Sequence, residues 1–141
     1  SIALEKIIFL YQERLKVLSE IVELTDFFFK KEMNYDAKLL VWKDADNETI
    51  LKALNILEEK LSMVVDNNWR KENLLTIIGP EAEKFKDGNR GYLLWPLRAA
   101  LSGKEASAGP FEIAEVLGKE KTLEKIQKAK SLIAKNKINF V

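Results

Sequence analysis

The 141-residue chain contains neither cysteine nor histidine. Without cysteine, disulfides and thiolate metal sites are excluded, which suits a reducing compartment such as the cytoplasm. Without histidine, serine–histidine and cysteine–histidine nucleophilic pairs, histidine general bases and imidazole zinc sites are excluded as well. Most of the common catalytic arrangements are therefore impossible within this sequence.

Long apolar runs are also missing, so no stretch is predicted to span a bilayer and no membrane partner is expected. Hydrophobic residues make up 47% of the chain and charged residues 32%, which indicates one soluble domain with a real core. The first residues show no secretory signal pattern, and we expect a cytoplasmic protein. The chain starts at Ser1 without an initiator methionine, and we expect it to be a fragment of a longer protein.

Helical periodicity runs through nearly the whole sequence, and strand-like alternation is absent. The predicted fold class is all-α, a compact array of short and medium helices. Residues 30–35 have the composition of a connector, which predicts two helical subdomains at about 1–35 and 36–141. Asp46 or Asn47 is predicted to cap a long helix. Its buried stripe is predicted to hold Ile50, Leu54, Leu57, Leu61 and Val64.

Three local signals predict helix boundaries. Ser19 is expected to be the N-cap of a second helix. Gly79 and Pro80 are expected to end one helix and to begin the next. Pro96 is expected within the first turn of a helix over about 92–101, where its missing amide hydrogen costs little.

No residue set in the chain is arranged for covalent catalysis, and the glycine and carboxylate clusters lack the spacing of nucleotide or metal loops. The stretch from Arg98 to Pro110 is suited to binding instead. Arg98 offers a planar fork of donors, Ser107 a hydroxyl and Lys104 a charge, around small residues that let a partner approach the backbone. Two interpretations stay open: a site for unstacked single-stranded bases, or a helix–loop–helix corner with an ordinary surface arginine.

The same stretch resembles the C-terminal anticodon-binding region of bacterial glutamyl-tRNA synthetases. The matching residues are PLRAALSGK at 96–104, Ser107, GPFEI at 109–113 and LGKE at 117–120. Upstream, QERLKVLSE at 12–20 and the three phenylalanines at 27–29 are similar to the helical segment that joins this region to the rest of the synthetase. The resemblance thus covers essentially the whole chain, although 39–86 match only in helical character.

The resemblance implies a role for individual residues. Arg98 matches an arginine that contacts the first anticodon base, and Arg14 one that reads the third base. Ser107 matches a small hydroxyl residue near these bases, and Pro110 an apolar residue that packs beside them. Lys104 is a weaker candidate for RNA binding. The chain departs from the family at Pro110, where leucine is common, and at the neighbouring position 108, where alanine replaces a frequent proline.

The resemblance also implies a function. The chain would be the tRNA anticodon recognition module of a glutamate–tRNA ligase, with no catalytic residue and no metal or cofactor of its own. ATP and magnesium would belong to the catalytic domain of the parent polypeptide, and that domain and the glutamate-specific tRNA would be the partners.

The lysine-rich stretch at 119–137 could approach phosphates or form a solvated helix face. The alternative is a helical protein–protein interaction domain that binds no RNA. Trp95 and Phe111 are expected in the core rather than as stacking platforms.

Overall fold

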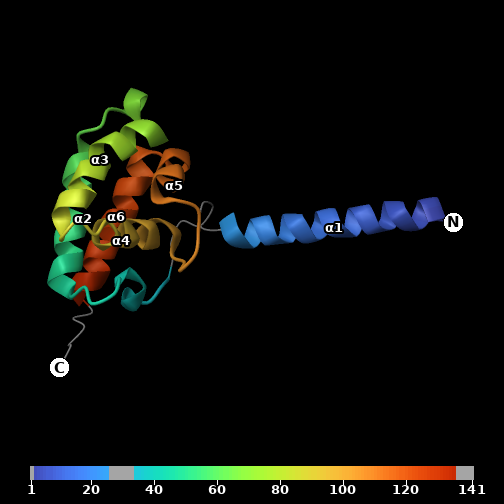
Figure 1. Ribbon diagram of the computed structural model, residues 1–141, viewed down its shortest axis with the longest axis horizontal. Coiled ribbons are helices and arrows are strands. Elements are labelled where there is room, and N and C mark those ends of the chain that lie inside the picture. The colour runs from blue at the N-terminus through green and yellow to red at the C-terminus, as the bar shows by residue number, and fades with distance from the viewer. Residues whose placement is uncertain (1, 26–33, 136–141) are drawn as a thin grey trace. The chain divides into compact units, whose positions relative to one another are not determined.

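Helices form all of the regular structure in the part of the chain that the computed structural model describes, residues 2–25 and 34–135 (Figure 1). Within these ranges there is no strand, which confirms the all-α prediction. The elements in chain order are α1 (Ile2–Thr25), η2 (Ala37–Leu40), α2 (Asn47–Ser62), η3 (Asp66–Asn68), α3 (Lys71–Phe85), α4 (Gly91–Ser102), α5 (Pro110–Leu117) and α6 (Lys119–Lys135), where η marks a 3₁₀ helix.

Contacts divide the chain into two compact units, residues 1–33 and 34–141. The first contains α1, which continues without a break through Ser19, so the predicted helix start at this serine was wrong. Neither glycine nor proline lies near Ser19, and nothing forces the backbone out of the helix there. The phenylalanines at 27–29 lie outside the described residues, and of the predicted connector at 30–35 only the last two residues are described. The division into subdomains at about residue 35 stays a prediction.

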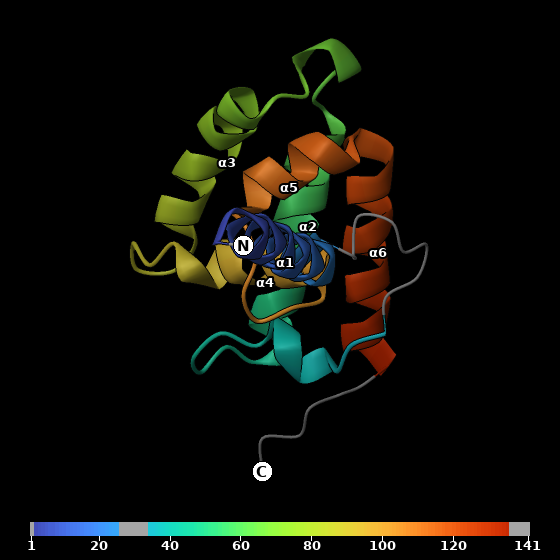
Figure 2. The same ribbon diagram turned by 90° about the vertical axis from the view of Figure 1, so that its right-hand side faces the viewer.

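Helix α4 forms the centre of the second unit, where it contacts α2, α3, α5, α6 and η2 (Figure 2). Its composition explains this position, because apolar residues occur on all sides of the helix rather than on one stripe. Leu93, Leu97 and Leu101 are completely buried. Ile50, Leu54, Leu57 and Leu61 of the predicted stripe are buried in α2, whereas Val64 is buried beyond the end of this helix at Ser62. Asp46 caps α2 by accepting a hydrogen bond from the Thr49 amide at 2.8 Å.

Pro80 lies inside α3, so the prediction that a helix ends at Gly79 was wrong. A residue before proline is normally pushed out of the helical conformation by contact with its Cβ, and Gly79 has none. Pro80 is exposed, so water can reach the carbonyl group that loses its helical partner. Ile78 and Ala82, on either side of this pair, are fully buried and hold the helix on the core.

Pro96 lies deeper inside α4 than predicted, because the helix begins already at Gly91. The Arg90 carbonyl accepts hydrogen bonds from the Leu93 amide at 3.2 Å and the Leu94 amide at 3.0 Å. These bonds close the first turn before Pro96, whose ring is buried. The proline therefore removes one amide donor from the second turn, and burial within the helical core compensates for it.

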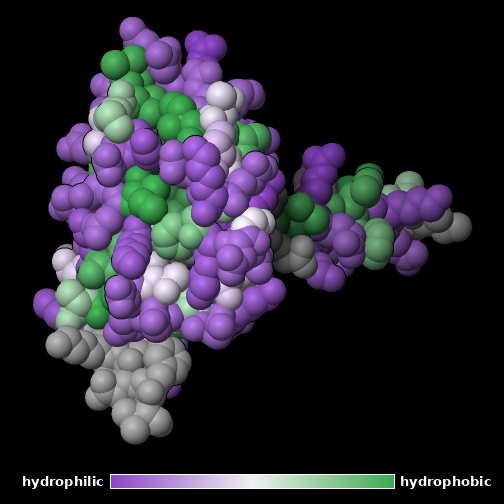
Figure 3. Space-filling model, turned by 60° about the vertical axis from the view of Figure 1, so that its left-hand side comes forward, coloured by the Kyte–Doolittle hydropathy of each residue, from purple (hydrophilic) through white to green (hydrophobic). Residues whose placement is uncertain are grey.

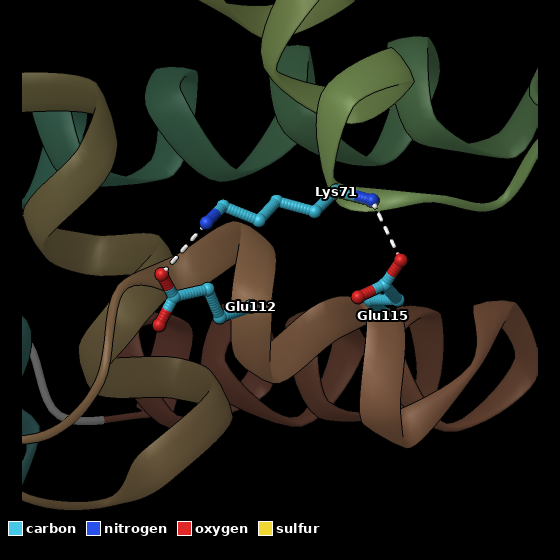
Figure 4. Close-up of polar contacts among 3 residues, drawn as sticks. All are labelled: Lys71, Glu112 and Glu115. Atoms are coloured by element: carbon cyan, nitrogen blue, oxygen red, sulfur yellow. Dashed lines mark hydrogen bonds and ion pairs between the residues drawn. The ribbon is translucent and has the colours of Figure 1, made fainter.

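Lys71, the first residue of α3, contacts two carboxylates of α5, the helix that follows the loop at 103–109 (Figure 4). The ammonium of Lys71 donates to the Glu112 carboxylate at 2.9 Å, and the Lys71 backbone amide donates to the Glu115 carboxylate at 3.2 Å. The pKa of Glu112 is lowered, chiefly by the hydrogen bond from Lys71, and the same contact raises the pKa of Lys71. Both carboxylates lie on α5, so one residue joins the start of α3 to it.

Candidate nucleic-acid interface

Arg98 lies on α4, half-buried, with its guanidinium held on two sides. Its Cζ lies 4.7 Å from the centroid of the Trp95 ring, and its Nη2 donates to the Glu105 carbonyl at 2.8 Å. The Trp95 ring is itself fixed, because its indole N–H donates to the Leu39 carbonyl at 2.9 Å. A guanidinium stacked on a ring and bonded to the backbone has little freedom, so its remaining donors keep a defined direction.

The loop after α4 is shaped by Ser102, which sequence reasoning did not select. Its buried hydroxyl donates to the Arg98 carbonyl at 2.8 Å and accepts from the Lys104 amide at 3.1 Å. Gly103 then ends α4 with a left-handed φ of 66°, a conformation that favours glycine. A serine directly before a glycine at the end of an apolar helix is the sequence signal that points to this arrangement.

The structure brings Arg98 and Pro110 together in one pocket of about 270 Å³. The other lining residues are Trp42, Gly91, Leu94 and Trp95. Pro110 is half-buried at the first position of α5, directly after the loop. Trp42 and Gly91 were not predicted as part of the site, because nothing in the local sequence indicates that they meet.

Ser107 and Lys104 lie in the same loop as Arg98's partner Glu105, and neither lines the pocket. The Ser107 hydroxyl is half-buried and donates to the Ala108 carbonyl at 2.9 Å, which stiffens the loop. Lys104 is also half-buried. Arg14 lies on α1, in the other compact unit, with an exposed side chain. The proposed contacts of these residues with bases stay predictions.

Three cations stack on three aromatic rings, two of which, Trp42 and Trp95, line the pocket. Besides Arg98 on Trp95, the Lys43 ammonium lies 4.5 Å from the centroid of Trp42 and the Lys86 ammonium 4.4 Å from the centroid of Tyr92. The rings of Trp42 and Tyr92 meet edge to face with centroids 4.9 Å apart. We call Trp42, Tyr92, Trp95 and these three cations the cation–aromatic cluster.

An acidic residue is built into this cluster as well. The Tyr92 hydroxyl donates to the Asp44 carboxylate. The hydrogen bond lowers the pKa of Asp44 and raises the pKa of Tyr92. The Asp44 carboxylate is thus hydrogen-bonded to Tyr92, whose ring packs against the ring of Trp42. Trp95, expected in the core, is half-buried and lines the pocket, whereas Phe111 is buried as expected.

The lysines of α6 differ in their surroundings. Lys130 donates to the Glu58 carboxylate at 3.2 Å, so its charge is paired within the fold. Burial lowers the pKa of Lys125, and the neighbouring Lys128 and Lys121 lower it further. Lys121 and Lys128 have exposed side chains. Lys135, at the end of α6, is exposed too, so these three lysines of the predicted basic stretch are available to phosphates.

In the described ranges no group of histidine, cysteine or carboxylate side chains is placed to hold a metal ion. The same part of the chain has no helix of the length and apolar character needed to cross a membrane.

Residues 1–130 match the family described as anticodon binding domain. The chain belongs to the anticodon binding domain family. The match extends over α1 and over the second unit as far as residue 130 within α6, so both parts of the chain are included. The resemblance of the sequence to an anticodon-binding region is confirmed.

Curated relatives of this anticodon binding domain are glutamate–tRNA ligases. Those of Clostridium botulinum (strain Okra / Type B1) and Clostridium tetani (strain Massachusetts / E88) are 38% and 39% identical to the chain, over 87% and 86% of its length. That of Herpetosiphon aurantiacus is 35% identical over 89% of the chain. In all three the match covers 25% of the relative, so the chain spans about a quarter of the length of these proteins.

Proposed function

We propose that this chain is the tRNA anticodon recognition module of a glutamate–tRNA ligase. Membership of the anticodon binding domain family and the similarity to glutamate–tRNA ligases support the assignment. The intact class I enzyme would attach glutamate to its tRNA with ATP and magnesium bound in a separate catalytic domain. The present chain would supply tRNA specificity to that domain in the cytoplasm and would catalyse nothing alone.

Arg98 is the proposed reader of the first anticodon base. The main support for this role is that the Arg98 guanidinium is stacked on the Trp95 ring and hydrogen-bonded to the Glu105 carbonyl. A guanidinium fixed in this way discriminates between hydrogen-bonding patterns. A freely moving arginine would pair with any phosphate or base edge within reach. Pro110, which lines the same pocket, would pack against the strand, and Ser107 and Lys104 would contact it from the loop. Arg14 would read the third base.

The direct test replaces Arg98 in two ways and measures equilibrium binding to RNA hairpins with the glutamate anticodon or a changed anticodon. Arg98→Ala is expected to lose about 1–3 kcal/mol of specific binding. Arg98→Lys keeps the charge but not the planar fork, so it should bind both hairpins with nearly equal affinity.

The control variant is Lys128→Ala, because Lys128 is exposed on α6 and lies outside the pocket. It is expected to weaken binding to both hairpins alike and to reduce the salt dependence. If Arg98→Ala kept the parent's preference for the glutamate anticodon, the proposed role of Arg98 would be wrong.

The alternative function, a protein-binding helical domain without RNA binding, has one observation in its favour. A groove of about 540 Å³ is lined by α2, α3 and the segment between them, with Met63 and Val65 exposed by 64% and 57%. In Figure 3 separate hydrophobic patches lie among the hydrophilic residues of the second unit. RNA binding that ignores the anticodon sequence and disappears with salt would favour this alternative.

A further inference from the structure

We infer that α1 is a docking helix, whose apolar side packs against another helix of the ligase polypeptide, outside the quarter of the ligase that this chain matches. The inference rests on the proposed function, because it needs the intact ligase of which the chain would be one module. It gives the first unit a protein-binding surface in addition to Arg14. The partner is a helix with an apolar stripe of its own.

The described side chains of α1 leave much apolar surface open. Among the residues that the structure describes, fourteen large hydrophobic side chains are exposed, and nine of these lie between Leu4 and Leu18. In Figure 3 the hydrophobic colour accordingly recurs along α1. Scattered exposed apolar residues are normal on a protein surface, whereas a continuous patch marks an interaction site. The concentration on one helix therefore points to a partner.

The spacing of these residues indicates that the partner is a helix. Five of them follow one another in steps of four, three, four and three residues. This is the 3.5-residue repeat by which one helix packs lengthwise on another, and neither a strand nor an RNA loop requires it. We call the five residues the seam, and they are Leu4, Ile8, Tyr11, Leu15 and Leu18.

The surface of α1 is hollowed beside the seam. A hollow of about 380 Å³ is lined by Leu10, Glu13, Arg14, Val17 and Leu18. The first four of these residues stand at positions i, i+3, i+4 and i+7 of the helix. Four residues of one helix enclose each inserted side chain of the other when two helices pack in this way. The hollow therefore offers a place for one side chain of the partner helix.

Arg14 lies on the apolar side of α1, unlike other charged residues of this helix. At about 100° of rotation per residue, Glu5 and Lys16 point away from the seam, whereas Arg14 falls between Leu10 and Leu18. A long basic side chain can pack its stem on apolar surface while its charged end stays in water. A partner helix on this side would therefore hold the stem of Arg14 and leave its guanidinium available to RNA.

The comparisons with relatives support a partner within the same polypeptide. The family match begins at residue 1 and includes α1, yet the chain spans only 25% of the ligases that it resembles. Every described side chain of α1 is exposed, although helices in proteins owe most of their stability to packing. A partner helix on the same polypeptide is present at high effective concentration, which an unrelated protein is not.

The test compares two substitutions in the intact ligase. Leu15 belongs to the seam and Phe9 lies on the opposite side of α1, and their side chains are exposed by 65% and 61%. Leu15→Gln and Phe9→Gln therefore remove similar apolar surface from the same helix. Hydrogen exchange of the α1 amides, measured without RNA, reports docking. These amides should exchange at least about tenfold more slowly in the intact ligase than in the isolated chain. Leu15→Gln should lose most of this protection and Phe9→Gln should keep it.

The isolated chain provides the controls for folding and for a different occupant. Both variants of the chain should melt as the parent chain does, because both side chains are exposed there. Sedimentation should give a monomer for the parent and for both variants. A dimer of the parent chain that Leu15→Gln abolishes would show that a second copy covers the seam, and the inference would be wrong.

Arg14 provides a second readout in the intact ligase. Leu15→Gln should weaken the preference for the third base of the glutamate anticodon, in the same direction as Arg14→Ala, because the stem of Arg14 loses its support. Phe9→Gln should keep the preference. A loss of preference in Arg14→Ala alone would contradict the support of Arg14 by the partner helix.

The docking inference and the proposed function fail in different ways. Equal exchange of the α1 amides in the intact ligase and in the isolated chain overturns the docking inference, and so does equal exchange in the Leu15→Gln and Phe9→Gln ligases. If α1 is protected as expected but no preference for the glutamate anticodon exists, the proposed function is wrong and the docking inference stands.

Discussion

The two helical glycines of the second unit predict opposite responses to the same substitution. At Gly91 an added methyl group would lie within 2.6 Å of three atoms of the Trp42 ring. At Gly79 it would have no neighbour within 4 Å, apart from the adjoining residues of the chain. Gly79 lies in the interior of α3, where alanine has its full intrinsic advantage over glycine, whereas Gly91 is the first residue of α4, where this advantage is smaller.

The magnitudes follow from these surroundings. Forcing additional atoms into packed surroundings typically costs about 1–3 kcal/mol, so Gly91→Ala should lower the free energy of unfolding by roughly that amount. Gly79→Ala gains up to about 1 kcal/mol of helix propensity, part of which is lost because alanine before Pro80 is disfavoured in the helical conformation. We therefore expect Gly79→Ala to leave stability unchanged or slightly raised.

Thermal and urea unfolding, followed by circular dichroism, measure both variants against the parent. A difference of 1 kcal/mol should shift the melting temperature of a domain of this size by about 4 °C, which is well resolved. The signal of Trp42 should also change in Gly91→Ala, because its ring has to move. Equal stability of the two variants would refute the argument that Gly91 is required by the Trp42 ring.

Three further predictions concern the second unit. The Tyr35 hydroxyl is buried without a hydrogen-bond partner, and burial raises its pKa to about 12; Tyr35→Phe should be neutral or stabilising by up to about 1 kcal/mol. In a spectroscopic titration of the parent, Tyr35 and Tyr92 should both ionise late because both pKa values are raised, and Tyr35→Phe should remove part of this late signal. Asp46→Ala removes the cap of α2 and should cost about 1 kcal/mol in urea unfolding; an unchanged midpoint would contradict the capping role. The hydrogen bond from Lys71 lowers the pKa of Glu112. Their contact therefore stabilises the fold fully at a pH above the ordinary pKa of a glutamate, and this stabilisation is lost as the pH falls through the lowered pKa of Glu112. The stability difference between the parent and Glu112→Gln should therefore shrink between pH 7 and pH 3, and a constant difference would show that the contact is not ionic.

Local sequence signals predicted those parts of the fold that depend on short-range physics. Asp46 caps α2 as expected. The heptad-like spacing of Ile50, Leu54 and Leu57 identified the buried face of α2, because helical geometry alone places them together. These features need no knowledge of the partners of each helix.

Two of the three incorrect helix boundaries depend on tertiary contacts. Gly79 and Pro80 form a typical helix-ending pair, and burial of Ile78 and Ala82 on either side overrides that signal. The packing around α4 likewise accommodates Pro96 in its second turn. In α1 the apolar residues do share one helix, yet large side chains such as Leu15 are exposed, as the hydrophobic colour along α1 in Figure 3 illustrates.

The candidate site was predicted only in part for the same reason. Arg98 and Pro110 were found from residue type and motif, and they do line one pocket. Trp42 and Gly91 are far apart in sequence and meet only because the segment after η2 packs against the start of α4. The stacking of Arg98 on Trp95 is a one-turn neighbour contact, three positions apart on a helix, and this spacing was available in the sequence.

The central claim is that this chain reads an anticodon, and its most direct test is equilibrium binding of the chain to two RNA hairpins at low and moderate salt. One hairpin carries the glutamate anticodon and the other has its anticodon bases changed. A preference for the glutamate anticodon that survives the increase in salt is the predicted result, because base contacts depend on salt far less than phosphate contacts do. Equal binding of both hairpins that disappears with salt would contradict the claim and would leave only a basic surface.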